Sequence, residues 1–186
     1  MIFTMSCSRT RNLSQSDYEW IPYRGNDTLI FASNTGGIDT IFILKKDTIW
    51  DYPDAQSSVG LQCEVVRVFC QHTDSVIQDK SVRYLGNDFY SIRKAKNGHT
   101  ILEVNLLTKD VVFYRLGLIN LDSLNKVKPI TLKTKEKQYN DVYVINAEDY
   151  LDSFRKRHSF VTKIYWSKSR GLVRYDKENG NYWEIE

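Results

Sequence analysis

Hydrophobic and polar residues alternate along most of the chain in short segments, which is the pattern of half-buried β-strands. These segments are rich in Val, Ile, Thr, Tyr, Phe and Trp, and Gly, Asn, Asp or Ser separates most of them. We therefore expect an all-β fold, mainly antiparallel, in the form of a barrel, a half-barrel or a sandwich. The pattern predicts strands at residues 28–33, 39–44, 61–71, 81–84, 89–95, 100–107, 111–116, 130–134, 141–146, 160–167, 172–176 and 182–185.

One segment, residues 147–158, has a helical pattern instead. Its apolar residues Tyr150, Leu151 and Phe154 have the spacing of one helix face. Three acidic residues lie near its start, where negative charge favours a helix. The sequence thus predicts one short helix near 147–158 in an otherwise β-rich chain.

The registers of two hairpins follow from their turns. A three-residue loop at 178–180 places Tyr175 opposite Trp183 and gathers the apolar side chains on one face, whereas a two-residue loop would not. The same argument favours a three-residue loop at 96–98. Each loop ends in a glycine, which we expect to adopt the positive φ of a bulged type I turn.

Length and composition indicate one packed domain without a nucleic-acid partner. The chain has 186 residues, of which 41 % are hydrophobic, so it can bury a substantial core. A formal net charge of +3 is too small to indicate nucleic-acid binding. The basic excess lies in residues 126–137 and 155–158, which we interpret as solvated surface rather than as a phosphate or head-group site.

The sequence contains no arrangement typical of catalysis. It lacks a glycine-rich phosphate loop, a zinc-binding H-E-x-x-H, a C-x-x-C and a nucleophile elbow. We therefore expect a protein that is not an enzyme, with no catalytic residue, no metal and no cofactor. The three histidines are dispersed along the chain: His72, His99 and His158. Four acids could form a catalytic pair but are of a common surface type: Asp51, Asp54, Glu148 and Asp149.

Two cysteines share one predicted strand. Cys63 and Cys70 are seven residues apart with no turn between them, so an extended strand separates their Cα atoms by about 23 Å. A disulfide requires less than about 7 Å. Their odd spacing places them on opposite faces, and we expect both to be buried free thiols.

Cys7 differs from these because it lies at a change in composition. It follows Ile-Phe-Thr-Met-Ser and precedes a polar stretch with one leucine, which suits the end of an export segment followed by a flexible tether. On this interpretation of Cys7, residues 1–17 form a remnant of the export segment and a flexible tether, and residues 18–186 form one β domain. Six residues are too few for an export signal and contain no Lys or Arg, so either translation starts upstream or Cys7 is an ordinary cysteine of a cytoplasmic protein.

Three segments resemble a group of bacterial proteins. They are Trp20-Ile-Pro-Tyr-Arg-Gly-Asn-Asp-Thr-Leu-Ile-Phe-Ala-Ser-Asn, Gln138-Tyr-Asn-Asp-Val-Tyr-Val-Ile, and Ile164-Tyr-Trp-Ser-Lys-Ser-Arg-Gly-Leu-Val-Arg-Tyr-Asp with the terminal Tyr-Trp-Glu-Ile. Together they resemble small β-rich lipoproteins of Bacteroidota, most of them of uncharacterised function. The resemblance covers about a third of the chain. The resemblance implies a cell-envelope protein that is exported and anchored to a membrane through lipid on Cys7. The protein would lie on the periplasmic side or at the cell surface. The resemblance implies no ligand-binding residue.

Two functions follow as expectations. The first is a non-enzymatic cell-envelope lipoprotein whose tethered β domain binds a protein, glycan or lipid partner. The alternative is a soluble β-barrel or half-barrel that carries a small apolar ligand or lipid. An apolar, unfilled interior would favour the carrier, and a filled interior would favour binding on the surface.

Overall fold

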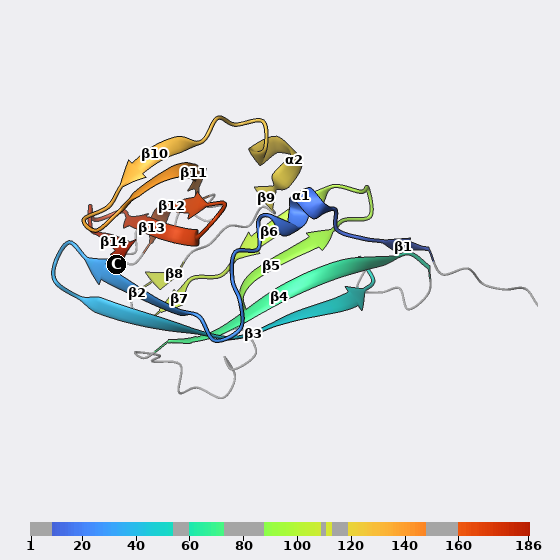
Figure 1. Cartoon of the computed structure of the whole chain (residues 1–186), viewed down its shortest axis with the longest axis horizontal. Coiled ribbons are helices and arrows are strands. Elements are labelled where there is room, and N and C mark those ends of the chain that lie inside the picture. Colours follow the sequence, from blue (N-terminus) through green and yellow to red (C-terminus); the bar gives the residue numbers. More distant parts are fainter. Residues whose placement is uncertain (1–8, 54–59, 73–87, 109–110, 113–118, 148–159) are drawn as a thin grey trace, which may run out of the picture.

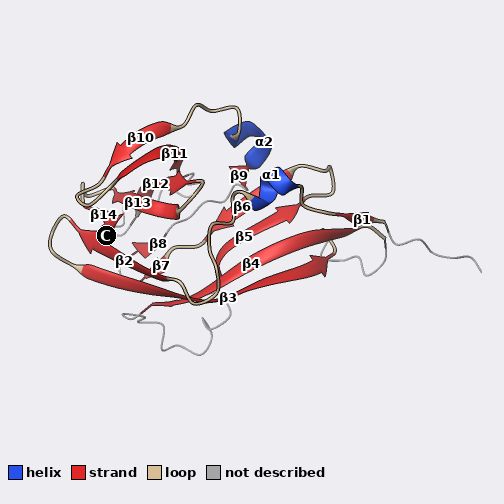
Figure 2. Ribbon diagram, in the orientation of Figure 1, coloured by secondary structure: helices blue, strands red, loops and turns tan. Residues whose placement is uncertain are grey.

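The computed structural model describes residues 9–53, 60–72, 88–108, 111–112, 119–147 and 160–186. These residues form a mostly antiparallel β structure with two short helices, which confirms the predicted fold class (Figures 1 and 2). The helices are α1 (Gln15–Tyr18) and α2 (Leu121–Leu124). The strands are β1 (Thr10–Arg11), β2 (Thr28–Ser33), β3 (Ile38–Asp51), β4 (Gln62–His72), β5 (Asp88–Lys94), β6 (Thr100–Val104), β7 (Leu107–Thr108), β8 (Val111–Val112), β9 (Ile119–Asn120), β10 (Ile130–Lys133), β11 (Gln138–Asn146), β12 (Val161–Ser167), β13 (Gly171–Lys177) and β14 (Tyr182–Ile185).

The main sheet follows one continuous path and curls into a half-barrel. Its order is β10-β11-β12-β13-β14-β2-β3-β4-β5-β6-β9, and β1 adds to β4 as a parallel strand. The C-terminal strand β14 therefore lies between β13 and the first long strand, β2, and joins the two halves of the sheet. Figure 1 shows these halves facing each other across the interior.

Strand positions agree closely with the sequence pattern. Strands β2 and β14 have the predicted bounds, whereas β3 continues seven residues beyond its predicted end at Leu44. A bulge near Leu44 explains the difference, because the simple alternation stops there while pairing with β4 continues. The predicted strand at 81–84 and the predicted helix at 147–158, apart from Ala147, lie outside the described residues. The sequence pattern did not predict α1 or α2.

Both hairpin registers are confirmed. Tyr175 pairs with Trp183, and in the other hairpin Ile92 pairs with Leu102. The loop-ending glycines have the expected positive φ, 89° at Gly98 and 82° at the equivalent position 180. Alternation of apolar residues and turn chemistry together were sufficient to fix both pairings.

The two faces of β4 explain the state of the cysteines. Cys70 belongs to the core cluster on the concave face, together with Val66 and Val68. Cys63 is 1 % exposed and lies outside that cluster, on the other face of the strand. Both cysteines are buried and outside any disulfide, as predicted. Burial also raises the pKa of Cys63.

Candidate functional site

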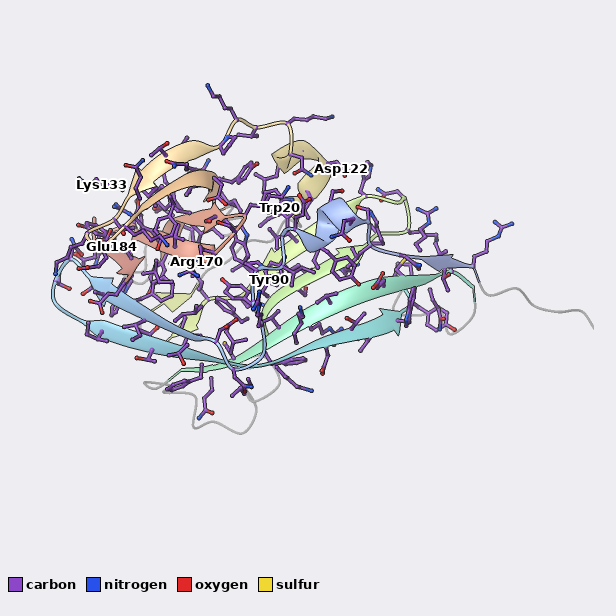
Figure 3. All side chains as sticks on the ribbon, viewed as in Figure 1. Trp20, Tyr90, Asp122, Lys133, Arg170 and Glu184 are labelled. Carbon is purple, nitrogen blue, oxygen red and sulfur yellow. The ribbon has the colours of Figure 1, made fainter. Side chains whose placement is uncertain are left out.

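The N-terminal segment, residues 13–23, fills the concave side of the half-barrel. Trp20 is fully buried, and its ring centroid lies 4.7 Å from that of Tyr143. Tyr23 packs edge-on against Phe89 and Trp166, with centroid distances of 5.3 and 5.9 Å. Figure 3 shows Trp20 between the two halves of the sheet. Aromatic side chains therefore occupy the space that an apolar ligand would need in this described part of the interior.

Hydrogen bonds fix this segment to both halves of the sheet. The Tyr90 hydroxyl donates to the Trp20 carbonyl at 2.6 Å, and the Trp20 indole donates to the Asn125 side chain at 3.2 Å. The Leu172 amide donates to the Tyr23 hydroxyl at 2.8 Å. Because these groups are largely buried, each bond also satisfies a polar group that would otherwise lack a hydrogen-bond partner.

Two acids hold the beginning of the segment. Asp17 closes a capping box with Ser14 at the start of α1, and its carboxylate lies 2.8 Å from the Lys94 ammonium. Burial alone would raise the pKa of Asp17, but hydrogen bonds from Lys94 and Ser14 outweigh burial and lower it. Glu64 on β4 accepts hydrogen bonds from the Leu13 amide and the Tyr18 hydroxyl. The hydrogen bond to Glu64 and burial raise the Tyr18 pKa to about 12.

The described part of the expected tether is packed on the sheet. Residues 10–11 pair with β4, residues 15–18 form α1, and Leu13 and Asp17 are 7 % and 5 % exposed. The packed domain therefore includes residues 9–17, and Tyr18 is not its first residue. The polar composition of this segment suggested a tether. Its packing gave no local signal, because the residues that hold it, Glu64 and Lys94, are distant in the sequence.

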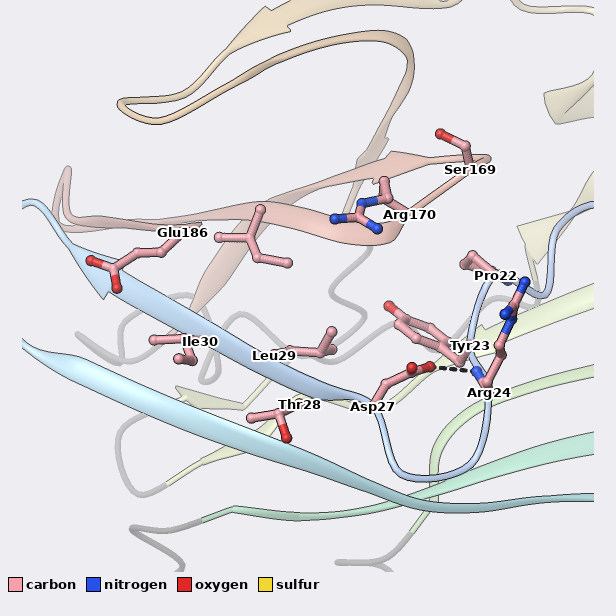
Figure 4. Close-up of a pocket in the computed structure, with 11 residues that line it drawn as sticks. Pro22, Tyr23, Arg24, Asp27, Thr28, Leu29, Ile30, Ser169, Arg170 and Glu186 are labelled. Atoms are coloured by element: carbon pink, nitrogen blue, oxygen red, sulfur yellow. Dashed lines mark hydrogen bonds between the residues drawn. The ribbon is translucent and has the colours of Figure 1, made fainter.

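A polar surface groove lies where β2 begins, and we call it the β2 groove. Its volume is about 500 Å³, and its walls come from residues 22–24 and 27–30, from Ser169 and Arg170 between β12 and β13, and from Ile185 and Glu186 at the end of β14. Figure 4 shows Arg170 above the space and Tyr23 at its floor. The groove is within the size range of ligand sites, roughly 300–1,000 Å³, but it is lined mainly by polar atoms.

The backbone of β2 bonds alternately to β3 and to β14 beside this groove. The Ile43 amide donates to the Asp27 carbonyl, and the Ser33 amide donates to Gly37, so odd-numbered residues of β2 make the backbone bonds to β3. The even-numbered residues direct their backbone groups away from β3. The Glu186 amide donates to the Ile30 carbonyl at 2.9 Å, whereas Thr28 lies beyond the end of β14. The backbone groups of Thr28 thus point to the β14 side of β2, as those of Ile30 do.

Two guanidinium groups line the groove without a carboxylate partner among the described residues. Arg24 is exposed, and its backbone amide rather than its side chain bonds the Asp27 carboxylate. Arg170 makes a side-chain hydrogen bond with Tyr139. Burial raises the pKa of Tyr139, and the charge and hydrogen bond of Arg170 offset part of that rise. The groove thus contains two cationic side chains, Arg24 and Arg170, and two acidic ones, Asp27 and Glu186.

A second groove, of about 510 Å³, lies over the opposite face of β4 and β5 and differs in its charges. There Arg67 lies 3.7 Å from Asp51, and Arg93 lies 3.7 Å from Glu103. Each of these arginines already has an acidic partner. The β2 groove is therefore the stronger candidate for a binding site.

The other candidate residues from the sequence are not brought together. Cys7, Asp54, Glu148, Asp149 and His158 lie outside the described residues. His99 contacts the Asp122 carboxylate at the surface, and Asp51 belongs to the second groove. Among the described residues, no group of three or more His, Cys, Asp or Glu could hold a metal ion, and no helix could cross a membrane. Most of the basic run at 126–137 is exposed.

Sequence reasoning missed the β2 groove because three distant segments form it. Arg24 and Asp27 lie before β2, and Arg170 lies in a turn about 145 residues later. The only local signal was the polar turn between Tyr23 and Thr28, which precedes an apolar strand.

The fold defines the class of the protein as a mainly antiparallel β half-barrel, whose concave side is filled among the described residues and whose surface carries a polar groove. Comparisons with protein-family models, with curated proteins and with solved structures find no match for this chain.

Proposed function

We propose that the protein is a non-enzymatic cell-envelope lipoprotein whose β domain binds a protein, glycan or lipid partner at the β2 groove. The observation that carries this proposal is the filled interior. Trp20 and Tyr23 are 0 % and 2 % exposed within the concave side, which supports binding at a surface groove rather than in this part of the interior.

The alternative, a carrier of an apolar ligand or lipid, is favoured by the curled shape of the sheet. A carrier requires an apolar space for its ligand. Residues 13–23 occupy that position here, and releasing Trp20 and Tyr23 would expose two large aromatic side chains to water. The filled interior therefore supports the surface-binding function over the carrier.

Anchoring through lipid on Cys7 is the second part of the proposal. Cys7 precedes β1 by three residues, and Figure 1 shows β1 at one end of the long axis, away from β2 and β14. An anchor before β1 would thus leave the β2 groove directed to solvent or to a partner. Two or more acyl chains on one cysteine suffice for stable membrane attachment, at about 0.8 kcal/mol per buried methylene.

Photo-crosslinking in the native host tests binding at the groove. A benzoyl-phenylalanine replaces Ile30, which is 40 % exposed beside the groove, or Trp50, which is 45 % exposed outside it. We expect an adduct of one defined mass from position 30, none from position 50, and loss of the adduct in Arg170→Gln. Equal adducts from both positions, or none from position 30, would contradict the proposed site.

Cell fractionation tests the anchor separately. With the gene expressed from its native start, the wild-type protein should enter the membrane fraction and incorporate labelled fatty acid, and Cys7→Ser should do neither. Cys63→Ser is the matched control, because that thiol is buried in the domain. Equal membrane association of wild type and Cys7→Ser would refute the anchor.

A further inference from the structure

We propose that the outer edge of β10 and the loop before it dock onto an anionic lipid surface. We call this surface the lysine edge, and its exposed side chains are Lys126, Val127, Lys128, Pro129, Ile130 and Lys133. The inference goes beyond the proposed function, because it needs neither the β2 groove nor lipid on Cys7. It also differs from the interpretation of residues 126–137 as solvated surface, which considered only their charge.

Unpaired positive charge is the first property of the lysine edge. Its three lysines are exposed, and none of them forms an ion pair with a carboxylate among the described residues. Residues 125–133 contain no acidic residue. A cluster of this kind is attracted to the negative surface of an anionic membrane, by about fivefold in affinity for each lysine that reaches it.

The acidic side chains around the lysine edge do not cancel its charge. Asp122 in α2 contacts His99. Glu184 on β14 accepts a hydrogen bond from the Lys135 amide at 2.9 Å. Glu136 is the third acid and lies in the turn after β10. Counting all three acids against the five lysines of residues 121–137 leaves a net charge of +2.

Exposed apolar side chains are the second property of the lysine edge. Val127 and Ile130 are 52 % and 42 % exposed, and Pro129 lies between them in the sequence. Lysines on an edge strand can also protect a sheet from pairing with another chain, but this role explains neither the exposed apolar residues nor the lysines in the loop. Both are explained by a membrane interface, where apolar side chains enter the acyl region and ammonium groups stay among the head groups.

The fold holds the lysine edge in an outward position. Asn125, the C-cap of α2, accepts a hydrogen bond from the buried Trp20 indole at 3.2 Å. The Val127 amide donates to the carbonyl of Leu124, which is only 8 % exposed. Figure 1 shows the loop and β10 along the upper margin of the molecule, and β10 is the first strand in the order of the main sheet. The loop can therefore meet a flat surface without rearrangement of the interior.

A membrane suits the lysine edge better than a nucleic acid does. Residues 121–137 contain no Phe, Tyr or Trp on which a base could stack. The exposed Val127 and Ile130 would gain little from a phosphate backbone, whereas acyl chains would bury them.

Vesicle co-sedimentation of the full 186-residue chain, produced without lipid on Cys7, tests the assignment. One set of vesicles contains phosphatidylcholine alone, and the other contains equal parts of phosphatidylcholine and phosphatidylglycerol. At about 0.1 M salt, where the Debye length is about 10 Å, we expect the anionic vesicles to be bound at least about tenfold more tightly than the neutral ones. Raising the salt should reduce this preference.

Two matched double variants test the charges. Lys128→Gln with Lys133→Gln should weaken binding to the anionic vesicles about twenty-five-fold, at about fivefold for each lysine. Lys46→Gln with Lys163→Gln removes the same charge from exposed positions on β3 and β12 and should have little effect.

A second pair of double variants tests the apolar contribution. Val127→Thr with Ile130→Thr keeps the β-branched shape and should weaken binding about tenfold. The control is Ile38→Thr with Leu44→Thr, at positions that are 57 % and 47 % exposed on β3, and it should bind as the wild type does. Amide spectra of all variants check that each remains folded.

Three results would overturn the assignment. The first is binding to anionic vesicles that is no tighter than binding to neutral ones. The second is an equal loss in the two lysine variants, which would indicate a diffuse effect of net charge. The third is a DNA duplex bound as tightly as the vesicles, through the same lysines and without any effect of Val127→Thr and Ile130→Thr. Crosslinking from position 30 and cell fractionation test the proposed function separately, so its outcome does not depend on these results.

Discussion

The hydroxyl of Tyr23 accepts a hydrogen bond from the Leu172 amide at 2.8 Å, across 149 positions of the sequence. This contact joins the N-terminal segment in the interior to the beginning of β13. Burial raises the pKa of Tyr23, so the hydroxyl remains protonated at all ordinary pH values. The same side chain forms the floor of the β2 groove, which links the packing of the interior to the proposed site.

Tyr23→Phe should lower the free energy of unfolding by about 1–3 kcal/mol, because it leaves the buried Leu172 amide without an acceptor. Chemical denaturation followed by tryptophan fluorescence measures the change. Tyr182→Phe is the control, since this ring is partly exposed on β14, and it should change stability by less than about 0.5 kcal/mol. Equal stability of Tyr23→Phe and wild type would show that the contact is unimportant.

Gly171→Ala should be more harmful than a glycine substitution in an open turn. Gly171 has φ of 84°, and an added Cβ would lie 2.1 Å from the Tyr23 hydroxyl oxygen. We expect a loss of about 2–5 kcal/mol from backbone strain and overpacking together. Gly180→Ala, at φ of 82° with no atom within 4 Å, should show only the strain, about 1–2 kcal/mol.

A double mutant separates the two effects at Gly171. In a Tyr23→Leu background the shorter side chain removes the clash, so Gly171→Ala should then cost no more than Gly180→Ala. If the cost of Gly171→Ala is the same in both backgrounds, the proximity to Tyr23 is not its cause.

The ion pair of Asp17 should make stability depend on acid pH. Its folded pKa lies below the unfolded value of about 3.9, so it stabilises the fold above pH 4, and the contribution is lost as pH falls through the folded pKa. Asp17→Asn should therefore cost roughly 2–4 kcal/mol at pH 7 and progressively less below pH 4. Exposed Glu136→Gln should change little at either pH, and a pH-independent effect of Asp17→Asn would exclude the ionic contribution.

Removal of residues 182–186 should abolish cooperative unfolding. This deletion removes β14, which pairs with β13 on one side and β2 on the other and so connects the two halves of the sheet. It also removes Ile185 from the core cluster. Denaturation curves and amide dispersion measure the result, and a truncated chain that unfolds as steeply as the full chain would contradict this role of β14.

The strands and hairpins could be predicted because their signals are local. Alternation identifies β2 and β14 residue by residue, and the glycines at 98 and 180 fix two registers. The packing of residues 9–17 could not be predicted in the same way. The polar stretch around Asp17 predicts a solvated side chain. Asp17 is buried instead, because its ion pair with Lys94, 77 positions later, makes that burial favourable.

The filled interior is the basis of the proposed function, and proton–proton contacts in solution test it most directly. Nuclear Overhauser effects should connect the ring of Tyr23 with those of Phe89 and Trp166, whose centroids lie 5.3 and 5.9 Å away. We predict that these effects persist unchanged in excess palmitate. Their absence, or their loss when palmitate is added, would show an interior that opens to an apolar ligand and would favour the carrier instead.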